Sequence, residues 1–161
     1  MEQARLADLI EHVMTGDPWH AGSVARTLEG ISPEDAARPG PGGAHGIWEL
    51  VLHMTAWARE VTARLGGRAA QEPDEGDWPP VGSPTPERWR DAQAALFAAH
   101  TALAAAVRQM DLSVLAQPVK DYRDDALGVG LSHYVTLHGL VHHTVYHQGQ
   151  LALLRRALDM R

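Results

Sequence analysis

Histidines gather in the stretch HHTVYHQGQL, residues 142–151, where three imidazoles fall within six positions. Together with the upstream His138 they form two pairs with helical spacing, His138 with His142 and His143 with His147. Side chains four residues apart lie one above the other on a helix, so either pair could present two imidazoles to one metal ion. The choice between the pairs depends on which face of the helix is buried.

The leucines of the predicted helix over residues 131–158 identify the buried face. At about 100° per residue they fall within roughly 60° of one another. His143 and His147 lie beside this stripe, whereas His138 and His142 lie on the opposite side. His143 and His147 are therefore the pair predicted to point inward. The leucines of the stripe are Leu140, Leu151, Leu154 and Leu158.

His53 is the best candidate for a third ligand. It lies in WELVLHMTAW, on the flank of an apolar stripe that runs through residues 47–65. Two adjacent helices would then offer one and two imidazoles, which makes a three-nitrogen site with open positions for water or substrate. Three further polar residues are candidates for the pocket or for hydrogen bonds to the imidazoles. They are His20, Glu49 and Gln150.

The composition limits both the metal and the function. The chain has no cysteine, so any metal must be held by nitrogen and oxygen ligands, and a divalent ion such as zinc or nickel fits three histidines. A net charge of −6 argues against nucleic acid as a partner. No apolar run is long enough to span a bilayer, and MEQARLADLIEH does not read as a signal peptide, so we expect a cytoplasmic protein.

Helical patterns dominate the chain, and patterns of alternating strand type are nearly absent. The first helix is expected over residues 1–15, broken at Pro18 and resumed over residues 19–30. Further helices are expected over residues 47–65, from Pro86 onward and over residues 131–158. Long connections are expected at residues 68–85 and 112–130, the second of them irregular. The prediction is an all-α four-helix bundle, formed by one domain over residues 1–161.

The remaining histidines receive structural interpretations. His100 falls in the apolar stripe of the helix after Pro86, which is typical of a buried or interface histidine rather than of a ligand. Surface or loop positions are predicted for His12, His45, His133, His138 and His142.

The segments WELVLHMTAW and HHTVYHQGQLALLRR resemble the DinB/YfiT-like superfamily of metal-binding four-helix bundles. Its recurring pattern is one histidine early in the second helix and HxxxHxGQ in the last. The resemblance covers nearly the whole chain, and GDPWHAGSVARTLEGIS and PGGAHGIWELVLH contribute to it. It implies an up-down-down-up bundle in which His53, His143 and His147 hold the metal, and the resemblance also implies a homodimer. Relatives include thiol-dependent transferases.

A metal ion bound by three neutral imidazoles keeps its full charge and can activate water or hold a thiol as thiolate. Because the chain has no cysteine, such a thiol would come from solution as a small molecule. The leading hypothesis is a metal-dependent enzyme that transfers a low-molecular-weight thiol to an electrophilic small molecule. The alternatives are a metal-dependent hydrolase and a non-catalytic bundle that binds a metal or ligand.

Overall fold

The computed structural model describes residues 1–122 and 130–159, and this part of the chain is helical without any strand. The all-α prediction is confirmed. None of the described helices is both long and apolar enough to cross a membrane. The elements are α1 (Glu2–Thr15), α2 (Val24–Leu28), α3 (Pro33–Ala36), the 3-10 turn η1 (Pro41–Gly43), α4 (Ile47–Leu65), α5 (Pro86–Gln109), α6 (Leu112–Leu115) and α7 (His133–Asp159).

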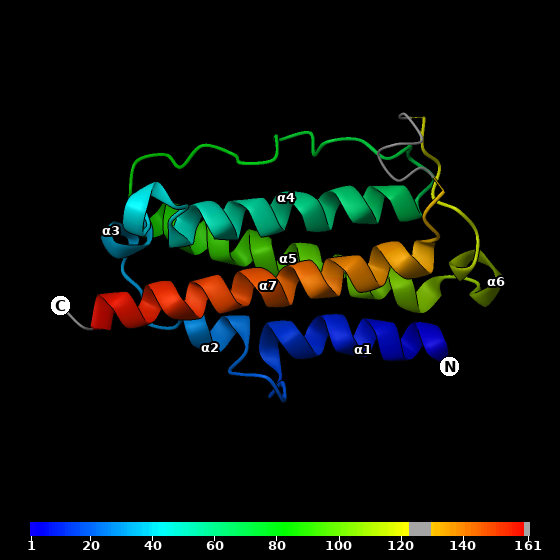
Figure 1. Ribbon diagram of the computed structural model, residues 1–161, viewed down its shortest axis with the longest axis horizontal. Coiled ribbons are helices and arrows are strands. Elements are labelled where there is room, and N and C mark those ends of the chain that lie inside the picture. The colour runs from blue at the N-terminus through cyan, green and yellow to red at the C-terminus, as the bar shows by residue number, and fades with distance from the viewer. Residues whose placement is uncertain (123–129, 160–161) are drawn as a thin grey trace.

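The four long helices lie side by side (Figure 1). Helix α5 packs against α1 and α4, and α7 packs against α4, α1 and α2. In Figure 1, α4 and α5 run from left to right, whereas α1 and α7 run from right to left. Buried alanines of α5, among them Ala92, Ala99 and Ala104, let its neighbours approach closely.

The first helix is broken, as predicted, but its second part is shorter than expected. Residues 19–23 are not helical, and α2 begins at Val24, where the Ser23 hydroxyl accepts a hydrogen bond from the Arg26 amide at 3.4 Å. The helix ends before Gly30, whose φ of 73° only glycine adopts easily. The prediction of a helix from Trp19 was wrong because Ser23, not Pro18, sets the start.

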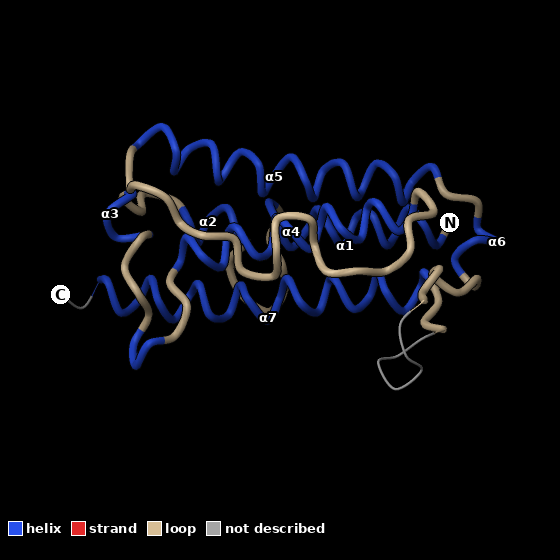
Figure 2. The backbone as a smooth tube through the Cα atoms, turned by 90° about the horizontal axis from the view of Figure 1, so that it is seen from above, coloured by secondary structure: helices blue, strands red, loops and turns tan. Residues whose placement is uncertain are grey.

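The connection from residue 66 to residue 85 is long because α4 and α5 run in the same direction. The chain must return along the length of α4 before α5 can begin, and Figure 2 shows this crossover passing over α4, between α5 and α7. Helix α5 then starts at Pro86, and the Thr85 hydroxyl caps it by accepting from the Arg88 amide. The expectation of an irregular segment at 112–130 was wrong at α6, and its residues 123–129 lie outside the described residues.

A buried ion-pair cluster links the crossover, residues 66–85, to α4. The side chain of Glu60 is fully buried and accepts hydrogen bonds from Arg64 Nε at 2.8 Å, from Arg68 and from the Gln71 amide at 3.1 Å. Arg68 also donates to Asp74 farther along the crossover. Three groups of the crossover are therefore held by one carboxylate of α4, directly or through Arg68.

The apolar core consists of two clusters with polar side chains between them. One cluster includes Leu96 and Leu151, and the other includes Leu103 and Leu140. Along α5 and α7 the residues between these levels include the buried polar side chains His100, Thr144, His147 and Gln148. Buried polar groups destabilise a fold unless they are hydrogen-bonded. Their concentration halfway along α5 and α7 therefore indicates a functional site at this level.

His100 should make the stability of the metal-free protein depend on pH. It is 2% exposed, its Nδ1 donates to the Leu96 carbonyl at 2.9 Å, and burial lowers its pKa from 6.5 to about 4. The folded state therefore keeps His100 neutral while the unfolded chain takes up a proton below pH 6.5. Stability is fully present above that pH and is lost as the pH falls toward 4.

We expect the loss attributable to His100 to reach about 2 kcal/mol at pH 4.5. Urea unfolding of chelator-treated protein at pH 7 and pH 4.5 measures it, with His100→Leu as the test and His142→Leu, at an exposed position of α7, as the control. Equal losses of stability in the His100→Leu variant and the wild type would contradict the assignment.

Candidate metal centre

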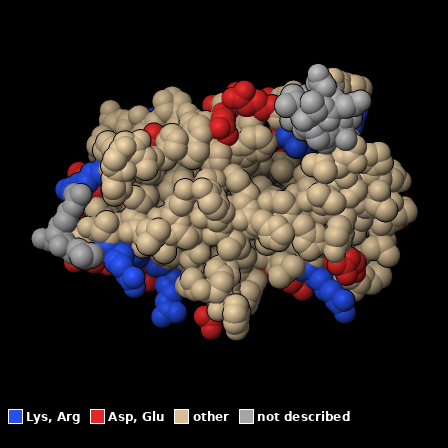
Figure 3. Space-filling model, in the orientation of Figure 1, with Lys and Arg blue, Asp and Glu red and all other residues tan. Residues whose placement is uncertain are grey.

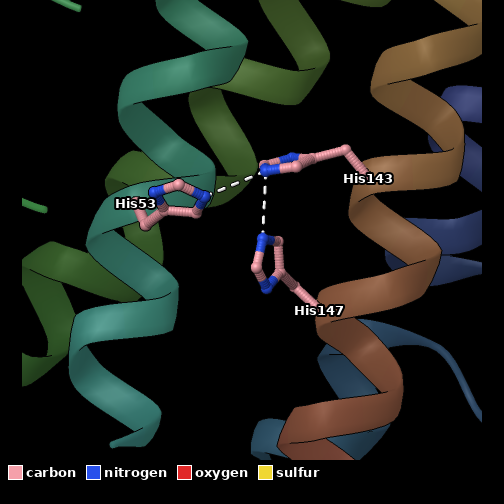
Figure 4. Close-up of side chains that lie close together, drawn as sticks. All are labelled: His53, His143 and His147. Atoms are coloured by element: carbon pink, nitrogen blue, oxygen red, sulfur yellow. Dashed lines mark hydrogen bonds between the residues drawn. The ribbon is translucent and has the colours of Figure 1, made fainter. Parts of the chain in front are cut away.

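Three imidazoles from two helices meet in the space between those helices (Figure 4). His53 comes from α4, and His143 and His147 come from successive turns of α7. His143 Nε2 lies 2.9 Å from His53 Nε2 and 3.0 Å from His147 Nε2. His53 and His147 are buried, and His143 is half-buried. The spacing of His143 and His147 by one helical turn is what lets both rings reach the same point.

The outer nitrogens of two rings have partners that fix their tautomers. His53 Nδ1 donates to the backbone carbonyl of Asp77 at 2.6 Å, and His147 Nδ1 donates to Gln150 Oε1 at 2.6 Å. With the proton on Nδ1, the Nε2 of each ring carries a lone pair. Both lone pairs point to His143 Nε2, which can satisfy only one of them well by donating a single proton.

This donor set fits a divalent metal ion better than it fits a closed hydrogen-bond network. The ligand nitrogens all lie within 4.8 Å of one another, so the three residues could hold one ion. Two nitrogens bound tetrahedrally to zinc at 2.0–2.1 Å are roughly 3.3 Å apart, so the present spacing needs only a small widening. Outer hydrogen bonds such as those to Asp77 and Gln150 are the usual way of orienting metal-ligating histidines.

The surroundings of His143 and His147 favour their neutral forms. Burial, helped by the neighbouring His147 and His53, lowers the pKa of His143 to about 4. Burial also lowers the pKa of His147, against an opposing effect of its hydrogen bond to Gln150. Neutral imidazole is the form that coordinates a metal, so protons compete weakly with a cation at these two residues.

The crossover supplies two residues that the sequence analysis did not identify. Besides its carbonyl, Asp77 places Oδ1 2.7 Å from the Trp57 indole nitrogen, which donates to it, and 3.2 Å from His53 Nδ1. The Trp78 ring stacks on His53, with centroids 3.9 Å apart, and on His45, with centroids 3.5 Å apart. The sequence signal for this contact was a tryptophan in the otherwise polar and proline-rich segment EPDEGDWPP. So large an apolar ring is stabilised by packing on another part of the protein.

Two cavities border the cluster. The first, here called the Tyr146 cavity, has a volume of about 510 Å³, and the second, the Arg64 cavity, about 460 Å³. His147 lines the Tyr146 cavity, whereas His53 and His143 line the Arg64 cavity. Figure 3 shows the surface hollowed between α4 and α7, with acidic side chains of the crossover gathered above it. A metal ion at the cluster would therefore be open to small molecules.

The three additional candidates occupy different surroundings. Gln150 contacts His147 as described and lines the Tyr146 cavity. Glu49 instead accepts at 2.7 Å from the amide of Gly46, the N-cap residue of α4, and lies 3.3 Å from His45, so its carboxylate stabilises the start of α4. His20 is exposed in the turn before α2, because the helix that would have turned it inward begins only at Val24.

One prediction for the other histidines was wrong. His133 was assigned to the surface but is buried, and its Nδ1 donates to the Gln117 carbonyl at 2.9 Å. His45 is exposed in a loop, as predicted, and it also lines the Tyr146 cavity and stacks on Trp78. His100 is buried, as expected for that position in the stripe.

Comparison with known families agrees with the geometry. A family model described as mycothiol-S-transferase matches residues 18–160. This is a DinB/YfiT-like family, which confirms the resemblance drawn from the sequence motifs. Comparison with curated proteins gave no match. Because the match spans almost the entire chain, including all three clustered histidines, the chain belongs to the mycothiol-S-transferase family.

Proposed function

We propose that this chain is a metal-dependent S-transferase that joins a low-molecular-weight thiol, with mycothiol as the first candidate, to an electrophilic small molecule. His53, His143 and His147 are the proposed ligands of a zinc or nickel ion. The observation that carries the proposal is the convergence of these imidazoles between two open cavities, with Nε2 of His53 and His147 left unprotonated by their outer partners. The family description supports the thiol.

The bound ion would supply Lewis acidity that favours the thiolate form of an incoming thiol, and thiolate is the nucleophilic form. The protein has no cysteine of its own, so the sulfur must come from solution. With a haloarene, the sulfur bonds to the ring carbon, the carbon–halogen bond breaks, halide leaves with the bonding pair and the thiol proton passes to water. With an epoxide, the carbon–oxygen bond breaks and the oxygen takes up the proton.

The residues around the cluster have supporting tasks in this proposal. Gln150 and the Asp77 carbonyl hold two imidazoles in the tautomer that coordinates. Trp78 covers one face of His53 and limits the access of water from that side. The cavities favour an enzyme over a structural metal site, because a structural metal is normally closed off by four protein ligands.

A screen of cellular thiols tests the function. Metal-loaded protein is mixed with chlorodinitrobenzene or styrene oxide and with mycothiol, glutathione or coenzyme A, and the conjugate is measured by mass spectrometry. The rate with one thiol should exceed that of chelator-treated protein on the order of a hundredfold, and it should collapse in His147→Ala. His142→Ala, at an exposed position of the same helix, is the matched control and should retain the rate.

The other outcomes separate the alternatives. No conjugate above the metal-free background with any thiol would contradict the transferase and favour a binding protein. Metal-dependent cleavage of an ester or amide without thiol consumption would favour the hydrolase.

The broader organisation is also a proposal. We propose one domain over residues 1–161 with the up-down-down-up bundle of the resembling superfamily, which the directions of the four long helices support. We propose a homodimer, since α5 leaves Ala94, Ala98 and Ala102 exposed for close helix packing; light scattering at the monomer mass would contradict this. The cytoplasm is the proposed location because thiols stay reduced there, and cell fractionation tests it.

A further inference from the structure

The two cavities reach the histidine cluster from different sides, and consecutive residues of the crossover divide them. Asp77 lines the Arg64 cavity, and Trp78 lines the Tyr146 cavity. The ligands are divided in the same way, with His53 and His143 on one side and His147 on the other. Two different molecules could therefore approach the same point without sharing a chamber.

The Tyr146 cavity is suited to an uncharged, apolar molecule. Its walls are formed by the rings of Trp78 and Tyr146 and by aliphatic side chains that include Leu50, Leu153 and Leu154. None of the described residues that line it is an aspartate, glutamate, lysine or arginine. Aromatic and aliphatic walls stabilise a ligand by removing its apolar surface from water and by ring stacking, and they offer little to a polyhydroxylated one.

The Arg64 cavity differs from the Tyr146 cavity in offering two charged side chains, Arg64 and Asp77, among apolar walls that include Trp57 and Val135. Arg64 is held by Glu60 and by the Gln71 carbonyl, so its guanidinium is positioned before any ligand arrives. The Asp77 side chain is 44% exposed, which leaves its carboxylate accessible to hydroxyl donors. Thr136 lines the same cavity, and its hydroxyl, which donates to the Ser132 carbonyl at 3.0 Å, can still accept a hydrogen bond. These groups can bind sugar hydroxyls and amides, which make up the carrier of a thiol such as mycothiol.

We propose that the Arg64 cavity binds the polar carrier of the thiol and that the Tyr146 cavity binds the apolar electrophile. This assignment rests on the proposed transferase function and specifies its substrate sites. The sulfur reaches the cluster from the side of His53 and His143, and the electrophilic carbon from the side of His147. Halide or alkoxide forms as the sulfur–carbon bond does, on the side where the electrophile is held.

Two glycines of α7 provide a matched pair of variants. A Cβ at either Gly139 or Gly149 meets nothing within 4 Å, and both glycines are helical, so a leucine adds the same helix preference at each. Gly139 lines the Arg64 cavity, whereas Gly149 lines neither cavity. Gly139→Leu therefore narrows one cavity, and Gly149→Leu is its control. Leu153→Trp narrows the Tyr146 cavity from the same helix.

Binding is measured with two unreactive probes on metal-loaded protein, S-methyl mycothiol by calorimetry and fluorobenzene by fluorine NMR. Gly139→Leu should weaken the binding of S-methyl mycothiol about tenfold, which is about 1.4 kcal/mol, and leave the binding of fluorobenzene unchanged. Leu153→Trp should weaken the binding of fluorobenzene and leave that of S-methyl mycothiol unchanged. Gly149→Leu should change the binding of neither probe. In turnover, the same variants should raise KM for the thiol and for the electrophile respectively.

The result that overturns the assignment is a crossed pattern, in which Gly139→Leu weakens fluorobenzene and Leu153→Trp weakens S-methyl mycothiol. Equal weakening of both probes by either variant, or no binding of either probe to the parent protein, overturns it as well. Selective binding in a protein that fails the thiol screen would instead contradict the transferase while supporting the two binding sites, so the two failures are distinguishable.

Discussion

Replacing His53, His143 or His147 with alanine should remove the metal from the protein, whereas the double change His138→Ala, His142→Ala should leave it bound. Each single change deletes one of three nitrogens that meet within 4.8 Å. Loss of an outer hydrogen-bond partner typically costs 10- to 100-fold in metal affinity, so loss of a direct ligand should exceed about a hundredfold.

His138 and His142 are a stringent control because they lie four residues apart on α7, as His143 and His147 do. The His138 ring lies against Tyr134 at a tilt of 53°, with centroids 4.4 Å apart, and His142 is exposed. Among the described residues, neither belongs to the group that could hold a metal ion. The test is the metal content per chain of each variant, measured on untagged protein purified without a nickel column. The opposite result would be that the alanine variants of His143 and His147 keep their metal while the double variant of His138 and His142 loses it. That result would show that the helix register assigned to the ligands is wrong.

Glu60→Ala should cost about 3 kcal/mol of folding free energy, the largest loss of stability expected from a single change of a charged residue in this protein. The side chain is fully buried, and its removal would leave Arg64, only 10% exposed, without its carboxylate partner. Breaking a buried ion pair from one side is costly because the remaining charge stays desolvated. Urea unfolding of the wild type and the variant measures the difference.

Glu75→Ala is the matched control for Glu60→Ala. Glu75 also pairs with an arginine across α4 and the crossover, at 2.5 Å from Arg59, but the two side chains are 39% and 52% exposed. An exposed pair of this kind contributes less than about 1 kcal/mol. The Glu60 variant should also bind metal more weakly. Glu60 binds the Gln71 amide of the crossover, and Asp77 of the same crossover accepts the hydrogen bond that orients His53. Equal stability losses in the two variants would contradict this account.

Helical periodicity was sufficient to bring the three imidazoles together from the sequence. The leucine stripe of the last helix distinguished His147 from His142, and the flank of the second stripe selected His53. These residues lie in long regular helices, where each side chain's direction follows from its position at about 100° per residue. The same reasoning failed for His20, because it depended on a helix start that a local cap moved to Val24.

The contacts made by the crossover could not be derived in this way. The Asp77 group that orients His53 is a backbone carbonyl, and every residue type has one. Trp78 reaches His53 through an irregular path without periodicity, so its stacking partner is set by tertiary packing alone. Glu49 is different, since a glutamate at the third position of a helix commonly accepts from the N-cap amide, and this role could have been assigned from the sequence.

The central claim is that one divalent ion lies between His53, His143 and His147. Anomalous diffraction from crystals of untagged protein, recorded at the zinc and nickel absorption edges, tests it directly. We expect one strong peak at about 2.0–2.1 Å from Nε2 of each of the three imidazoles, with Nδ1 of His53 and His147 still donating to Asp77 and Gln150. A metal-free cluster in protein supplied with both ions, or a peak beside His138 and His142, would contradict it.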